Sequence, residues 1–142
     1  MPYKEWLGRG GNVVAAASGV HIPLTRAGAV TWVCFLDAGT QSITLKESIS
    51  GASEQNLAVI DRLHKGPGIG GTWTLVTQAA AATFDLTTDA TNDCFVFTVG
   101  AEQLSSGFDC LEVTQSSGTC VAIIHDLHEQ RDPTALPTSV DT

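Results

Sequence analysis

The sequence is divided into many short segments that are rich in β-branched and aromatic residues, with turn-forming residues between them. Residues 29–36 read AVTWVCFL and end at the turn 37–39, and residues 42–46 alternate strictly between polar and apolar types. Eight or nine such segments, spaced roughly 8–14 residues apart, are typical of antiparallel strands. The pattern predicts an all-β fold, an antiparallel β-sandwich of jelly-roll-like type, rather than a helical one. The expected strands are 13–17, 29–36, 42–46, 56–63, 72–77, 83–87, 94–99, 108–114 and 119–124.

Helices are expected only as one turn at 101–104 and a short segment at 126–131, because no window shows a convincing helical apolar period. The length of 142 residues fits one domain, which we place at 13–126. With 43% hydrophobic and 15% charged residues, the chain as a whole is not of the disordered class. We expect an extended N-terminal arm at 1–12 and a C-terminal tail at 127–142.

The N-terminal arm combines glycines with two large aromatic residues, Tyr3 and Trp6. Large aromatics contribute much binding energy when an interface buries them, so the arm can serve as a docking segment. The alternative is a frayed terminus. We predict that Tyr3, Trp6 and Arg9 contact a partner, together with two residues of a later loop, His64 and Lys65.

The charge balance argues against direct binding to nucleic acid or to an anionic membrane. Seven Lys and Arg stand against fifteen Asp and Glu, which gives a net charge of −8, and no cation lies between Lys65 and Arg131. Proteins that bind nucleic acid are expected to carry a basic footprint. The sequence also contains no apolar stretch of membrane-spanning length and no apolar leader, so we expect a protein made in the cytoplasm.

Two sequence patterns resemble functional motifs but favour turns. Residues 66–71 match G-x-G-x-x-G, yet a strand pattern follows, whereas a dinucleotide site needs a helix there. We therefore predict a hairpin loop. The oxygen-rich residues Asp85, Asp89, Asn92 and Asp93 lack the EF-hand spacing, and Asp and Asn are common in tight turns.

The densest group of potential metal ligands is at 125–129, where His125 and His128 would share one face of a helix. A zinc site needs three or four ligands, and the remaining histidines are distant in sequence. We favour the simpler interpretation, a polar segment that leaves the last strand. We predict no metal, no cofactor and no catalytic residues.

The four cysteines are too few and too widely spaced for a disulfide framework, so we expect reduced, largely buried thiols. If a disulfide forms, Cys110 and Cys120 are the expected pair, because the strands that carry them follow each other along the chain. The apolar surroundings of Cys34, Cys94 and Cys120 favour inert thiols over nucleophiles.

From residue 40 to about residue 126, the sequence resembles small structural proteins of tailed bacteriophages. Three passages carry this resemblance: 44–58, with QNLA at 55–58; the hairpin segment 73–80; and 107–113, of the form GF-x-C-x-x-V. The C-terminal end from residue 125 departs from the family pattern. The resemblance implies a virion component, such as a head decoration (cement) protein, and it brings no catalytic residues.

We therefore expect a non-enzymatic virion structural protein that binds the outside of a phage capsid and stabilises it. Its expected partners are the major capsid protein and further copies of itself, as a dimer or trimer. One alternative is a carbohydrate- or host-surface-binding module that uses Trp73. Another is a cupin-like metal enzyme that uses His125 and His128.

Overall fold

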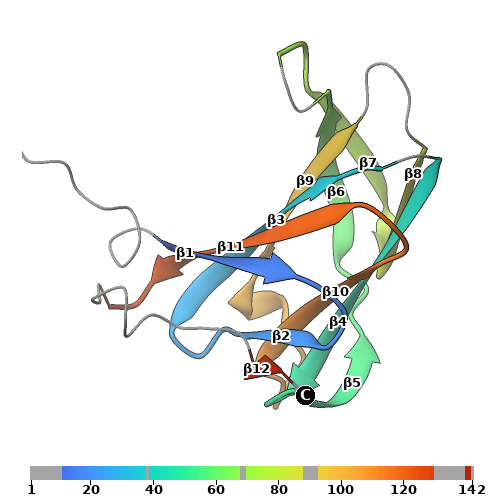
Figure 1. The fold of residues 1–142 in the computed structure, drawn as a ribbon. Coiled ribbons are helices and arrows are strands. Elements are labelled where there is room, and N and C mark those ends of the chain that lie inside the picture. The colour runs from blue at the N-terminus through green and yellow to red at the C-terminus, as the bar shows by residue number, and fades with distance from the viewer. Residues whose placement is uncertain (1–10, 38, 68–69, 88–92, 130–139, 142) are drawn as a thin grey trace, which may run out of the picture.

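In the computed structural model, the described residues are 11–37, 39–67, 70–87, 93–129 and 140–141, and they form two antiparallel sheets (Figure 1). The first sheet contains, in spatial order, β1 (Gly11–Ala16), β11 (Thr119–Leu127), β3 (Ala27–Phe35), β9 (Cys94–Gly100), β6 (Ile60–Gly66) and β7 (Thr74–Ala81). The second contains β12 (Val140–Asp141), β2 (Val20–Pro23), β10 (Cys110–Gln115), β4 (Thr40–Ile49) and β5 (Ala52–Asn56), and β8 (Thr83–Thr87) also pairs with β4. The prediction of an all-β, two-sheet fold is confirmed.

The predicted strand at 56–63 is confirmed only from Ile60, the start of β6, because the chain leaves the strand conformation at 57–59, between β5 and β6. The backbone N–H of Leu57 donates to the carbonyl of Leu45 at 3.0 Å, and the Leu57 side chain is buried. Burial of this leucine therefore ends β5 at Asn56, and β6 begins only at Ile60.

The expected helical turn at 101–104 is present as a short 3-10 helix, η1 (Ala101–Gln103). The expected helical segment at 126–131 is wrong in its described part, because β11 continues to Leu127, which pairs with Ala27 of β3. At the C-terminal end, β12 pairs with β2, so these two residues of the expected tail belong to a sheet. The sequence patterns also gave no indication of β2.

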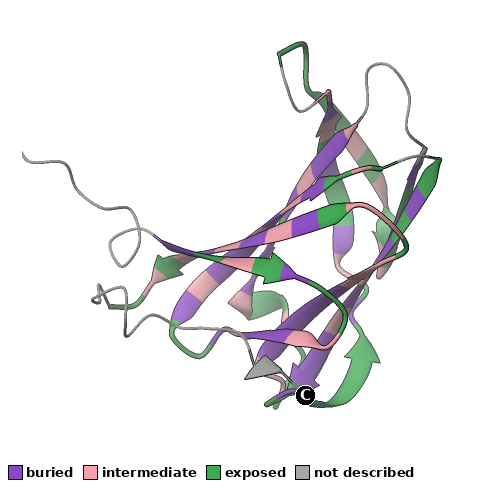
Figure 2. Ribbon diagram, in the orientation of Figure 1, coloured by how far each residue is buried: buried purple, intermediate pink, exposed green. Residues whose placement is uncertain are grey.

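The core lies between the sheets, as the alternating colours along the strands in Figure 2 show. In β9, Phe95, Phe97 and Val99 are buried, while Val96 and Thr98 between them are less so. Phe97 stacks on the fully buried Trp32 with ring centroids 5.3 Å apart. This alternation from Phe95 to Val99 gives the first sheet one face toward the core and one face away from it.

A disulfide joins Cys34 of β3 to Cys120 of β11, inside the core. These two residues are directly opposite each other in the antiparallel pair, with their Cα atoms 4.1 Å apart. Such a pair brings two Cβ atoms close on the same side of the sheet. The expectation of reduced thiols is therefore wrong for Cys34 and Cys120, and so is the expected pairing of Cys110 with Cys120. Cys94 and Cys110 are free and buried.

β6 ends at Gly66 and its antiparallel neighbour β7 begins at Thr74, so the glycine-rich segment 66–71, of which residues 68 and 69 lie outside the described residues, joins two paired strands. The prediction of a hairpin loop there is confirmed. Gly66 must be small, because a Cβ atom at this position would lie 2.9 Å from the ring of Trp73. The indole therefore covers the backbone of Gly66.

Candidate functional site

The side of the first sheet that faces away from the core carries a row of side chains that crosses all of its strands. Each member is the register partner of the next, so all of them project from this side, which we call the outer face. The row consists of Ala15, Val121, Val33, Val96, His64 and Leu75. A sheet face exposed to solvent normally carries polar residues, whereas most positions of this row hold apolar ones.

The outer face also collects most of the exposed large hydrophobic side chains. Among the described residues these are Val13, Phe35, Trp73, Leu75 and Ile49, with exposures of 43–49%. Val13 pairs with Ile123, next to the row. Phe35 follows Val33 by two residues along β3, so both side chains project from the same side of the sheet. Only Ile49 belongs to the other sheet. Apolar surface that gathers on one face is typical of an interaction site.

The edge strand of this sheet has no protective charges. Residues 74–81 of β7 read TLVTQAAA, without Lys, Arg, Asp, Glu or Pro, and most of them are exposed. Natural edge strands usually carry charges, proline or bulges that prevent pairing with another chain. Among the described residues, β7 is therefore an uncharged edge next to an apolar face, although its pairing with β6 is irregular near Ile60, and such an edge is suited to contact with another protein.

The outer face contains a hollow of about 200 Å³ between β6 and β9. It is lined by Arg62, Leu63, His64, Val96, Phe97 and Thr98. The row residues His64 and Val96 thus border a shallow depression that also offers the guanidinium of Arg62.

The structure separates the residues that we predicted to contact a partner. Tyr3, Trp6 and Arg9 lie outside the described residues. His64 is exposed within the row of the outer face, between Val96 and Leu75. Lys65 is paired with Phe95, a core residue, so its side chain projects from the opposite side of the sheet. His64 and Lys65 therefore cannot act together on one surface.

The histidines considered as metal ligands do not converge. His125 lies on β11, where its Nε2 is 2.8 Å from the hydroxyl of Thr31 and its Nδ1 is 3.3 Å from a carboxylate oxygen of Asp126. His128 follows the end of that strand, and its backbone N–H donates to the carbonyl of Arg26. The shared helical face on which that reading depended is absent, because residues 119–127 form a strand.

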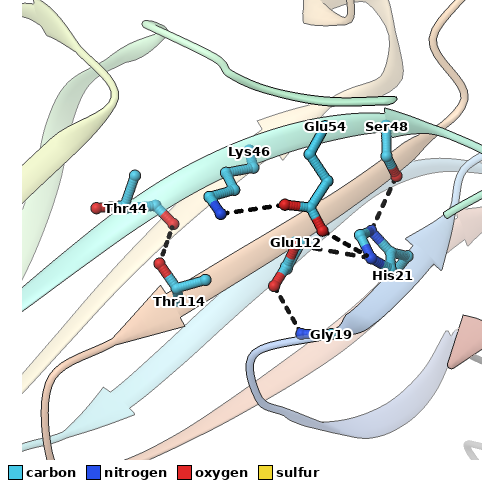
Figure 3. Close-up of polar contacts among 8 residues, drawn as sticks. All are labelled: Gly19, His21, Thr44, Lys46, Ser48, Glu54, Glu112 and Thr114. Carbon is cyan, nitrogen blue, oxygen red and sulfur yellow. Dashed lines mark hydrogen bonds and ion pairs between the residues drawn. The ribbon is translucent and has the colours of Figure 1, made fainter. Parts of the chain in front are cut away.

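Among the described residues, the potential metal ligands that do converge are His21, Glu54 and Glu112, on the second sheet (Figure 3). The His21 Nε2 atom is 3.3 Å from the Glu54 Oε1 atom and 3.7 Å from the Glu112 Oε2 atom. His21 and Glu112 are 0% and 1% exposed, whereas the Glu54 side chain is 37% exposed. The residues come from β2, β5 and β10, so sequence spacing gives no sign of the group. The only signal is a charged residue within an apolar strand pattern, at Glu112.

Hydrogen bonds fix the remaining polar atoms of this group. The Nδ1 atom of His21 is 2.9 Å from the Ser48 hydroxyl, and the Gly19 N–H donates to the Glu112 Oε1 atom at 2.7 Å. The Lys46 ammonium donates to the Glu54 Oε2 atom at 3.1 Å, and this hydrogen bond is the main reason that the pKa of Glu54 is lowered.

The carboxyl group of Glu47 and the thiol of Cys110 are also buried, and the pKa of each is shifted by its surroundings. Burial acts to raise the pKa of Glu47, but hydrogen bonds from Ser105 and Gln55 outweigh it, so the pKa lies below its usual value. Burial, together with the neighbouring Asp109, raises the pKa of Cys110 to about 11. A thiol with such a pKa is a poor nucleophile at neutral pH.

No family model, curated protein or solved structure matches the chain. Within the described residues, no helix has both the length and the apolar character needed to cross a membrane.

Proposed function

We propose that this chain is a non-enzymatic virion structural protein, which binds the outer surface of a bacteriophage capsid and stabilises it as a decoration protein. The single observation that carries the proposal is the outer face, where an apolar row crosses six strands and ends at the uncharged edge strand β7. Apolar residues on a sheet face gain most when a matching protein surface covers them. The resemblance at 40–126 supplies the choice of a capsid as that surface.

The proposal includes the finer features expected from the sequence. The sandwich is jelly-roll-like, and the parts of 1–12 and 127–142 that lie outside β1, β11 and β12 act as arms, with Tyr3, Trp6 and Arg9 reaching a neighbouring capsid subunit. The partners are the major capsid protein and further copies of the chain, because a free strand edge can pair with another strand. The net charge of −8 favours solubility of free subunits and disfavours contact with packaged nucleic acid.

The test uses two substitutions of equally exposed hydrophobic residues. Leu75 on the outer face and Ile49 on the second sheet are 47% and 44% exposed. Leu75→Lys should weaken binding to capsids purified without the protein at least about tenfold, because it would place a charge in the apolar contact. Ile49→Lys is the matched control and should bind as the wild type does. Neither change should alter stability by more than about 0.5 kcal/mol.

The measurement is occupancy on purified capsids, with copy number from mass spectrometry of whole virions. Many copies per particle are expected for a shell protein, whereas only a few would indicate a tail component. Deletion of residues 1–10 should abolish binding if the arm contributes. Equal occupancy by wild type and Leu75→Lys would contradict docking through the outer face.

A second function, binding of carbohydrate on a host surface, is favoured by one observation. Trp73 is 43% exposed and packs over Gly66, which leaves part of its ring open to a sugar face. The nearby hollow contributes polar groups from Arg62 and His64. A glycan array decides this alternative, since binding that disappears in Trp73→Ala would support it and an array without signals would count against it.

A further inference from the structure

The side chains of His21, Glu54 and Glu112 bring three potential metal-ligand atoms together on the second sheet. One ligand atom from each residue, His21 Nε2, Glu54 Oε1 and Glu112 Oε2, lies within 4.8 Å of the others. In a tetrahedral zinc site with bonds of about 2.0–2.1 Å, neighbouring ligand atoms are about 3.3 Å apart. The distances from Nε2 to the two carboxylate oxygens, 3.3 and 3.7 Å, are close to this value. The two distances that involve His21 are thus compatible with shared coordination of one ion, while the two carboxylate oxygens lie within 4.8 Å of each other.

Two of the three ligand atoms are buried without a hydrogen-bond partner. They are the Nε2 atom of His21 and the Oε2 atom of Glu112, and both face the centre of the group (Figure 3). A buried polar atom without a partner costs about 1–3 kcal/mol, and more when it is charged. Lys46 contacts the far oxygen of Glu54 rather than the centre. A cation between the three atoms would remove this cost.

The atoms that face away from the centre are each held by another group. In protein metal sites, the outer nitrogen of a ligating histidine and the second oxygen of a ligating carboxylate are usually hydrogen-bonded, which fixes the tautomer and the orientation of the ligand. Here Ser48 contacts the Nδ1 atom of His21, Gly19 donates to Glu112, and Lys46 donates to Glu54. If Nδ1 carries the proton and donates to Ser48, the lone pair of Nε2 points toward the centre.

We propose that His21, Glu54 and Glu112 bind one divalent transition-metal ion, with Zn²⁺ as the best-fitting candidate. One imidazole nitrogen and two carboxylate oxygens suit zinc, whereas Mg²⁺ and Ca²⁺ prefer oxygen ligands alone. Three protein ligands leave one coordination position for water. The ion would connect β2, β5 and β10, three strands that are distant in the sequence but belong to one sheet. Its proposed role is to hold the exposed strand β5 against that sheet.

The competing explanation is that a proton takes the place of the metal. A doubly protonated His21 would form ion pairs with Glu54 and Glu112 at the same distances, and the group would then be a buried ion triad. The two explanations differ in what is bound, so direct titration with a metal salt distinguishes them.

The experiment titrates the chelator-treated full chain with Zn²⁺ by calorimetry and measures the melting temperature with and without zinc. We expect one ion per chain and a rise in melting temperature, because a ligand that binds only the folded state stabilises it. Glu54→Gln should weaken zinc binding at least about 100-fold, since loss of even an outer-shell partner typically costs 10–100-fold. This side chain is 37% exposed, so the variant is expected to fold. Ser48→Ala should weaken binding about 10–100-fold through the orientation of His21.

Matched controls separate loss of the ion from loss of the fold. His125→Gln removes a histidine from the other sheet, and Glu47→Gln removes a buried carboxylate whose two oxygens already accept hydrogen bonds. Both controls should bind zinc as the wild type does. The proposal is overturned if the wild type takes up no stoichiometric zinc, or if Glu54→Gln binds zinc as tightly as the wild type. Nuclear magnetic resonance that finds His21 doubly protonated at neutral pH, with zinc present and unbound, would establish the ion triad instead.

Discussion

Reduction of the Cys34–Cys120 disulfide should remove a large part of the stability of this protein. The bond joins residues separated by 86 positions, so it closes most of the chain into one loop. The loop-entropy relation, with 86 residues in the closed loop, gives about 4.6 kcal/mol at 25 °C, within the usual range of about 2–5 kcal/mol for loss of a native disulfide. Domains of this kind are stable by only about 5–15 kcal/mol. We therefore expect reduction to lower the melting temperature by roughly 9–18 °C.

The assay is equilibrium unfolding in urea, followed by tryptophan fluorescence, with and without a phosphine reductant. Because Cys34 and Cys120 are buried, reduction is performed in urea before refolding. Reduced wild type keeps both sulfur atoms, so its comparison with the double variant Cys34→Ala/Cys120→Ala separates the lost packing from the lost cross-link.

The double variant should not respond to the reductant. A second double variant, Cys94→Ala/Cys110→Ala, keeps the disulfide and should respond as the wild type does. If reduction changes the unfolding free energy of the wild type by less than about 1 kcal/mol, the loop-entropy argument fails. If the unreduced, unfolded chain shows four reactive thiols, the bond itself is refuted.

Three further predictions concern single groups. Because the pKa of Glu47 is lowered in the folded state, its ionised form stabilises the fold above the usual pKa of 4.5. This contribution disappears as the pH falls through the lowered pKa. In the variant Glu47→Gln, the unfolding free energy measured in urea should therefore decrease less below about pH 4.5 than it does in the wild type. Because burial and Asp109 raise the pKa of Cys110 to about 11, this thiol should resist iodoacetamide in the native protein and react once the protein is unfolded, as peptide mass spectrometry can show. Gly118 and Gly39 both have positive φ, but of these two positions only Gly118 would bring an added Cβ atom into collision with backbone. In thermal melts, Gly118→Ala should therefore be more destabilising than Gly39→Ala, by about 1–3 kcal/mol. Equal melting temperatures of the two variants would contradict the steric argument.

The fold could largely be predicted because alternation and turn residues act locally. The segments around Trp32, Phe97 and Val113 were expected as strands, since β-branched and aromatic residues were bounded by glycine and polar turns. The prediction failed where a distant contact decides the outcome. Leu57 ends β5 because it reaches the carbonyl of Leu45 and the core, which no local pattern reveals.

The sites were much harder to predict, because each depends on register between distant strands. Cys34 and Cys120 become neighbours only when β3 pairs with β11. Similarly, His21 and Glu112 have no shared motif and meet only after β2 and β10 are placed side by side. His64 was expected in a loop and lies instead on β6 within the outer face.

The row that runs from Ala15 to Leu75 lies across the strands rather than along one of them. A partner seated on it would touch every strand of the first sheet, so a force that pulls the partner away would be distributed over five hydrogen-bonded ladders. No single strand would have to bear that force alone or peel from the edge.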